Sequence, residues 1–211
     1  MTLDMAGNME LICKRCFPRA TRVTDRFHIQ KLSTDALQEM RIKHRWEAMD
    51  AENEAIEHSK RTGCSFQAVT LQNGDAIKQL LARSRYVLYK KSPGWADSQK
   101  DRAALLFERF PDLKTAYGLS QLFENTKDKV FALANLAKWH EKVRQTGFKA
   151  FNTIARSIQD HHYQTILNYF DNRSTNASAE SFNAKIKAFR SQFRGVRNIE
   201  FFLFRLTQLY A

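Results

Sequence analysis

A short stretch near the carboxyl end of the chain carries three side chains that could do chemistry together. Glu180, Asn183 and Lys187 recur at i, i+3 and i+7, so a helix would align them on one stripe. The stripe places a carboxylate, an amide and an ammonium group side by side. A plainer interpretation stays open, because a glutamate in a first turn suits the helix dipole and a lysine often faces water.

Two aspartates near the amino end are the other candidates. Asp4 and Asp25 each lie at the end of a predicted strand, and a short predicted helix separates the two strands. Strands joined by a helical crossover run parallel, so both aspartates are expected at one sheet edge. Mg²⁺ prefers a few oxygen ligands from protein, and two such ions can promote phosphodiester cleavage. Asp4, Asp25 and Glu180 therefore form a candidate metal site.

The elements that must position these residues are mostly helical. Only 7 glycines and 3 prolines occur in 211 residues, and so few breakers favour helices. The first strand is expected to end at Asp4, a helix to span about 8–16, and a second strand to span 21–29. Ser174, Thr175 and Asn176 are good N-caps for the helix that carries Glu180. A phenylalanine-rich helix follows from Ile199 to Tyr210.

The middle of the chain reads as an antiparallel helical bundle. A long charged helix, capped by Ser33 or Thr34, is expected to run to about residue 60. A break follows at 63–74, and further helices are predicted up to about residue 170, the last of them a single helix from 151. Trp139 lies on an apolar helical face, which favours core packing.

The charge of the chain favours a polyanionic partner. The sequence has 34 Lys and Arg against 22 Asp and Glu, a net charge of +12, which indicates nucleic acid or, as the competing partner, an anionic membrane surface. No apolar run is long enough to span a bilayer. Three cysteines cannot form a disulfide framework, so a reducing cytoplasm is expected. Cys13 and Cys16 have the spacing of half a zinc site, but chance or packing explains them better.

Basic residues surround the candidate carboxylate Glu180. Such charges often form a solvated face, but here they lie where a phosphodiester would bind, and phosphate neutralisation is expected to be salt-dependent. Trp95 follows a Pro-Gly pair in a loop and could stack on an unpaired base. The residues predicted to contact DNA are Asn176, Asn183, Lys185, Lys187, Arg190, Arg194, Arg197 and Trp95.

Several strings of the sequence together carry a family resemblance. They are Leu3-Asp4-Met5, Phe17-Pro18-Arg19-Ala20, Asp25-Arg26-Phe27-His28, Trp139, Tyr169-Phe170-Asp171-Asn172-Arg173, Asn176, Glu180, Asn183, Lys187, Gly195 and Arg205. In order and spacing this set resembles the catalytic core of insertion-sequence transposases of the ISL-three family. The resemblance covers nearly the whole chain.

The resemblance implies an α+β, mostly α fold, with a partial RNase H-like core interrupted by an all-α insertion. Residues 1–30 and 173–211 would form the core, and residues 31–172 the insertion. Asp4 matches the second acidic residue of the DDE triad and Glu180 the third, so these two would bind Mg²⁺ or Mn²⁺. Asp25 and His28 match a supporting D-x-x-H pair, in which His28 could orient the scissile phosphate or steady Asp25.

One departure from the family bears on activity. The first aspartate of the triad has no counterpart here, which implies an amino-terminally truncated chain that is inactive alone. The expected partners are transposon ends, target DNA, a second copy or a full-length transposase, in the bacterial cytoplasm at the nucleoid and not at a membrane. The alternative function is a non-catalytic, basic helical DNA-binding protein or an inhibitor of full-length transposase.

Overall fold

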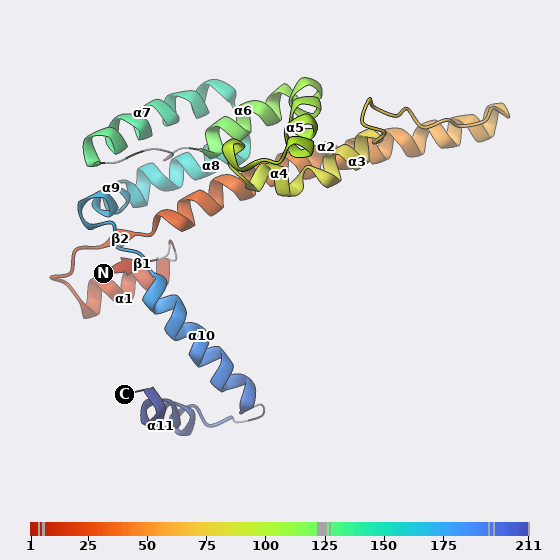
Figure 1. The fold of residues 1–211 in the computed structure, drawn as a ribbon. Helices are drawn as coiled ribbons and strands as arrows, with labels where there is room; N and C mark the ends of the chain where they lie inside the picture. Colours follow the sequence, from red (N-terminus) through yellow and green to blue (C-terminus); the bar gives the residue numbers. More distant parts are fainter. Residues whose placement is uncertain are drawn as a thin grey trace.

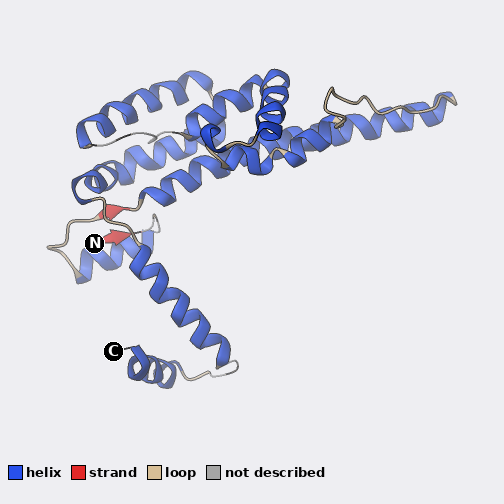
Figure 2. Ribbon diagram, viewed as in Figure 1, coloured by secondary structure: helices blue, strands red, loops and turns tan. Residues whose placement is uncertain are grey.

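Helices make up most of the described chain, as Figure 2 shows. The computed structural model describes residues 1–3, 5, 7–121, 126, 128–193, 195 and 197–210. The predicted mostly α class, with a small β component, is confirmed. The strands are β1 (Thr2–Leu3) and β2 (Val23–Thr24), and the helices are α1 (Gly7–Cys16), α2 (Arg26–Thr62), α3 (Ile77–Arg83), α4 (Arg85–Tyr89), α5 (Asp97–Arg109), α6 (Pro111–Ser120), α7 (Lys129–Thr146), α8 (Lys149–Ser157), α9 (Tyr163–Asn172), α10 (Ala177–Gln192) and α11 (Ile199–Tyr210).

The arrangement has two parts (Figure 1). Helices α2 to α9 form an elongated body, in which α2 runs along its length and extends beyond the other helices. The sheet and α1 lie at the other end of α2. From this end α10 leads away from the body, and α11 turns back beside it.

The longest helix, α2, starts directly after β2. Asp25 is its N-cap, because the carboxylate accepts a hydrogen bond from the Phe27 backbone N–H at 2.9 Å. The prediction of a strand over 21–29 is therefore wrong beyond Thr24, and the prediction that Ser33 or Thr34 caps the long helix is also wrong. Both of those residues are buried inside α2. Gly63 ends α2 in the left-handed conformation, with φ of 70°.

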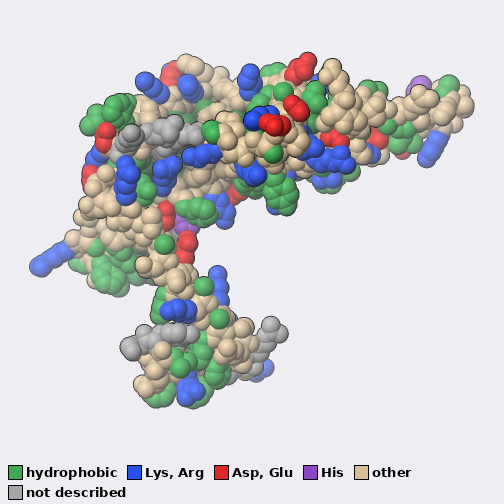
Figure 3. Space-filling model, in the orientation of Figure 1, with side chains coloured by type: hydrophobic (Ala, Val, Ile, Leu, Met, Phe, Trp, Pro, Cys, Tyr) green, Lys and Arg blue, Asp and Glu red, His purple; other side chains and the backbone are tan. Residues whose placement is uncertain are grey.

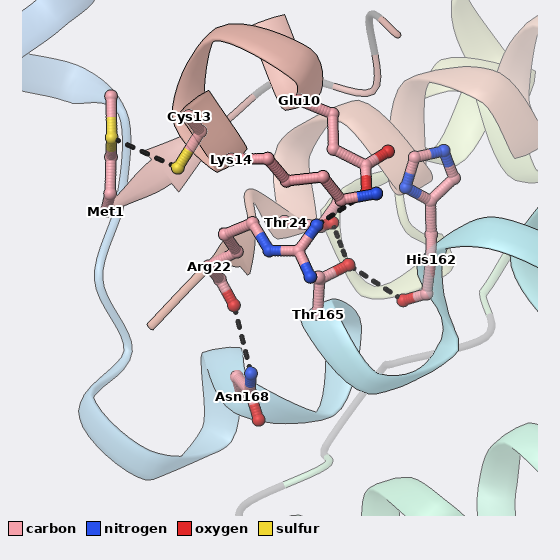
Figure 4. Close-up of polar contacts among 9 residues, drawn as sticks. All are labelled: Met1, Glu10, Cys13, Lys14, Arg22, Thr24, His162, Thr165 and Asn168. Carbon is pink, nitrogen blue, oxygen red and sulfur yellow. Dashed lines mark hydrogen bonds and ion pairs between the residues drawn. The ribbon is translucent and has the colours of Figure 1, made fainter. Parts of the chain in front are cut away.

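The sheet contains the predicted parallel crossover unit. Thr2 pairs with Val23 and Leu3 with Thr24, with α1 between the two strands. Two strands alone make a marginal sheet, and α9 stabilises this one. The Thr24 hydroxyl lies 2.6 Å from that of Thr165, and the Asn168 side-chain amide donates to the Arg22 carbonyl at 3.0 Å (Figure 4).

A continuous apolar core joins α2 to the helices that pack on it. Trp139 is only 4% exposed and donates its indole N–H to the Leu119 carbonyl at 2.9 Å, so its predicted core role is confirmed. The largest fully buried side chains of this core are Phe151, Ile29, Leu37, Leu80, Leu81, Leu88, Leu106, Leu113, Leu136, Ile158 and Ile166.

The segment from residue 151 to about residue 170 was predicted as one helix, but the structure divides it among three helical elements. A π-helical turn, η2 (Ile158–His162), lies between α8 and α9 without an intervening loop. A π turn inserts one extra residue into a helix and shifts the phase of its buried face. The prediction of an uninterrupted helical segment is therefore correct. The prediction that it is a single helix is wrong, because η2 changes the phase of the buried face.

The last two helices, α10 and α11, have the predicted positions. Phe189 of α10 is buried, with its ring centroid 4.5 Å from that of Phe193 and 5.4 Å from that of Phe202. Phe182, seven residues before Phe189 on the same helix, is 44% exposed. The contact between α10 and α11 thus buries one part of a surface that is otherwise rich in exposed phenylalanine.

Candidate active site at the sheet edge

Asp25 links the sheet to the helix that carries Glu180. It follows β2 directly and is only 6% exposed. One carboxylate oxygen accepts the Phe27 N–H at 2.9 Å, and the other accepts the Asn176 N–H at 2.8 Å. Asn176 is the N-cap residue of α10. A single buried carboxylate therefore connects the start of α2 to the start of α10, across 151 residues of sequence.

The neighbouring strand ends at the same edge. Leu3 is the register partner of Thr24, and its carbonyl accepts the Asp25 N–H at 3.1 Å. Asp4 lies outside the described residues, so the convergence of Asp4 with Glu180 stays a prediction.

Glu180 lies in the first turn of α10, close to this edge. It is four residues after Asn176, a displacement of about 6 Å along the helix axis, and its N–H donates to the Asn176 carbonyl at 2.9 Å. Its side chain is exposed, as are those of Asn183 and Lys187 farther along the helix. The carboxylate also lies where the helix dipole favours negative charge.

His28 lies beside Asp25, in the first turn of α2 and not at the end of a strand as predicted. Its backbone N–H donates to the Asp25 carbonyl at 3.1 Å, and its ring meets that of Phe27 edge to face at 5.8 Å. Its Nε2 is buried without a hydrogen-bond partner among the described residues. An unsatisfied buried nitrogen is unfavourable, so this atom has the capacity for one further polar contact.

The described residues do not by themselves fit a complete metal site. No group of three His, Cys, Asp or Glu side chains within the described ranges has the geometry to hold a metal ion. Both Asp25 oxygens already accept backbone N–H groups, and Glu180 is an exposed carboxylate nearby. A metal centre here would need oxygen ligands in addition to these described side chains.

The basic residues predicted to contact DNA lie on α10 or directly after it. Lys185, Lys187 and Arg190 are exposed on this helix, and Arg197 is exposed after it, while Arg194 lies outside the described residues. Figure 3 shows Lys and Arg side chains along this part of the molecule. Their position next to Glu180 gives this region a positive surface.

Trp95 lies in the connection between α4 and α5. These two helices belong to the helical body, which Figure 1 shows apart from α10. Its indole N–H donates to the Val87 carbonyl at 2.9 Å, and its ring packs 5.5 Å from that of Tyr117 and 6.3 Å from that of Phe107. The half-buried ring therefore helps to hold α4, α5 and α6 together. Its predicted stacking on DNA stays untested, and this packing favours a structural role.

A charged cluster supports the sheet from the side of α1 and η2 (Figure 4). Glu10 pairs with Arg22 at 2.6 Å and with Lys14 at 3.1 Å, and the hydrogen bond from Lys14 is the main reason that the pKa of Glu10 is lowered. Burial lowers the pKa of the nearby His162, and Glu10 partly opposes that shift. This cluster stabilises the strand that leads into Asp25.

Comparison with known proteins gives a family match. A family model described as a transposase matches residues 1–206. No curated protein and no solved structure gives a match. Separately, none of the helices within the described ranges is long and apolar enough to cross a membrane.

Proposed function

The chain belongs to the ISL-three family of DDE transposases, and from this membership we propose that it binds DNA and contributes to metal-dependent strand cleavage and strand transfer. Its partners are the ends of a mobile element and its target DNA, at the bacterial nucleoid. The net charge of +12 supports a polyanionic partner.

The proposed architecture is a partial RNase H-like core made of residues 1–30 and 173–211. Residues 31–172 are the helical insertion between its two parts. The parallel β1–α1–β2 unit and the attachment of α10 beside it support this division.

The observation that carries the proposal is the bridge from Asp25 to the Asn176 N–H. It holds the first turn of α10, and with it Glu180, next to the edge where β1 and β2 end. We assign Asp4 and Glu180 as ligands of Mg²⁺ or Mn²⁺. Such an ion, when bound, supplies activation of water and stabilisation of a leaving oxygen. The described residues do not themselves include a group of three side chains that could hold the ion.

Asp25 and His28 have supporting roles in this proposal. Asp25 is a positioning residue, because its two oxygens are used to fix the starts of α2 and α10. The unsatisfied Nε2 of His28 is suited to a hydrogen bond with Asp4 or with a DNA phosphate. Lys187 and Arg190 neutralise phosphates near Glu180 without reading base sequence.

A plasmid assay tests the proposal. Because Asp4 and Glu180 match only the second and third carboxylates of the family's triad, the chain alone is expected to bind supercoiled plasmid without nicking it in Mg²⁺ or Mn²⁺. Supplying a full-length family transposase whose own third acidic residue has been replaced is expected to restore nicking. Glu180→Gln should abolish this restored nicking and leave folding unchanged, because the side chain is exposed. Restored nicking that survives Glu180→Gln would refute the assignment.

A second candidate function is inhibition of full-length transposase by a non-catalytic DNA-binding chain. The favouring observation is the exposed apolar surface of α11, where Phe201, Leu203 and Phe204 are 49%, 50% and 59% exposed. In the same assay, an inhibitor would lower nicking by an intact full-length transposase. A chain that supplies Glu180 to the active site would instead raise nicking by the full-length transposase whose third acidic residue has been replaced.

A further inference from the structure

A second basic surface lies on the helical body, where α4 packs against α2. Its centre is Arg41, which is only 5% exposed. The Arg41 guanidinium donates to the Gln38 side chain at 2.7 Å and to the Leu81 carbonyl at 2.9 Å. Both acceptors are neutral oxygens, so these hydrogen bonds fix the position of the guanidinium but do not neutralise its positive charge.

Two further arginines lie close to this buried charge. Burial, and then repulsion from Arg45 and Arg85, lower the pKa of Arg41. None of the three forms an ion pair with a carboxylate among the described residues. Gathering positive charges without a counter-charge is unfavourable when one of them is buried. The cluster is therefore suited to an anionic ligand.

Exposed aromatic side chains lie on the same two helices as these arginines. On α2, Trp46 is 59% exposed, one turn after Ile42, which is 43% exposed. On α4, Tyr86 is 68% exposed, and the Arg85 guanidinium lies 5.6 Å from the centre of its ring. Tyr89, 47% exposed, lies close enough to interact electrostatically with Arg41.

The space-filling view places charge and apolar surface together here. Figure 3 shows Lys and Arg side chains beside hydrophobic ones over the part of the body where α3 and α4 lie. Large exposed aromatic groups next to uncompensated arginines are the combination that binds unpaired bases and their phosphates. A duplex keeps its bases stacked inside, so it could use the arginines but not the ring of Trp46.

We propose that the α2–α4 surface, formed by Arg41, Ile42, Arg45, Trp46, Arg85, Tyr86 and Tyr89, binds single-stranded DNA. Trp46 stacks on a base, Arg45 and Arg85 contact phosphates, and Arg41 is a positioning residue. This inference deepens the DNA-binding part of the proposed function. It is independent of Glu180, because these residues belong to the body and Glu180 to α10.

Intrinsic fluorescence gives a direct test, because the three tryptophans differ in environment. Trp46 is exposed, Trp139 is buried, and Trp95 is half-buried and hydrogen-bonded. Oligothymidine of about 12 nucleotides, within the usual site sizes, is expected to quench the fluorescence of the chain. Trp46→Phe should remove that quenching, and Trp95→Phe should retain it. Quenching that persists in Trp46→Phe would overturn the proposal.

Affinity for the same oligonucleotide gives an independent test. Trp46→Ala is expected to weaken binding by about 5- to 150-fold, the range measured for loss of one stacked base, and Trp46→Phe should recover most of it. Arg45→Gln should reduce the salt dependence of log K by about 0.7. Phe131→Ala on α7, where the ring is 64% exposed, is the matched control and should change nothing.

The outcomes separate this inference from the proposed function. If Trp46→Ala binds oligothymidine as the wild type does while Lys187→Gln weakens duplex binding, the α2–α4 proposal fails and the α10 assignment stands. If instead Trp46→Ala weakens binding of oligothymidine and Lys187→Gln leaves duplex binding unchanged, the α2–α4 proposal stands and the α10 assignment fails. Quenching of Trp46 by polyglutamate but not by oligothymidine would identify an acidic peptide as the ligand and overturn the proposal.

Discussion

Replacing Asp25 with alanine tests how strongly one buried carboxylate holds two helices. The change removes the N-cap of α2, which costs about 0.5–2 kcal/mol in comparable cases. It also leaves the half-buried Asn176 N–H without its acceptor, and an unsatisfied buried donor costs about 1–3 kcal/mol. The expected loss of unfolding free energy is therefore about 1.5–5 kcal/mol.

Asp25→Asn separates the two contributions. The asparagine oxygen can still accept the Phe27 N–H, so the cap of α2 is retained. Its amide nitrogen then faces the Asn176 N–H, and two donors cannot bond to each other. We expect a loss of about 1–3 kcal/mol, together with faster amide hydrogen exchange at Asn176 and in the first turn of α10.

Urea unfolding followed by circular dichroism gives the free energies, and hydrogen exchange locates the change. Asp35 is an exposed aspartate on the same helix, so Asp35→Ala is the matched control and should stay within about 0.5 kcal/mol of the wild type. The reasoning is refuted if Asp25→Ala costs no more than Asp35→Ala. It is also refuted if exchange at Asn176 is unchanged in Asp25→Asn.

Two further predictions concern charge. Lys187→Gln and Arg190→Gln each remove one exposed positive charge, so each should reduce the salt dependence of log K for duplex DNA by about 0.9. Anisotropy titrations at several salt concentrations measure this, and Lys142→Gln on α7 should have no effect. Burial lowers the pKa of His140 and of His162. A histidine whose pKa is lowered by folding binds its proton more weakly in the folded state than in the unfolded state. The free energy of unfolding is therefore highest above the ordinary histidine pKa of about 6.5, and it falls as the pH drops below that value. Thermal unfolding at about pH 7.5 and about pH 5.5 should show this loss, smaller in His140→Gln; an equal loss in that variant would contradict the assignment to His140.

Features with local causes were predicted well from the sequence. The end of α7 has such a local cause, because Gly147 adopts the left-handed conformation there, with φ of 68°. The start of α10 after Asn176 and the crossover unit at the amino end were also predictable, since capping residues and short apolar segments determine them.

Features that depend on distant partners were not predicted. The β-branched residues before Asp25, followed by Phe27 and Ile29, gave a strand pattern that hid the start of α2. The second role of Asp25 depends on Asn176, which is 151 residues away. Trp95 follows a Pro-Gly turn, as an exposed loop residue often does, but folding brings Phe107 and Tyr117 against its ring.

The candidate site was predicted in part. The sequence correctly placed Glu180 in the first turn of a helix, at a spacing that aligns it with Asn183 and Lys187. The structure adds that all three side chains are exposed. It placed His28 at the end of a strand, whereas His28 begins a helix because Asp25 caps it. The convergence of Asp4 with Glu180 stays a prediction.

Paramagnetic broadening by Mn²⁺ tests the central claim most directly. The claim is that the edge where β1 ends and the first turn of α10 hold one divalent ion between them. In an isotope-labelled chain titrated with Mn²⁺, the amide resonances of Leu3, Asn176 and Glu180 should broaden together, and Glu180→Gln or Asp4→Asn should abolish the effect. Broadening of Leu3 without Glu180, or equal broadening in the Glu180→Gln variant, would contradict the account.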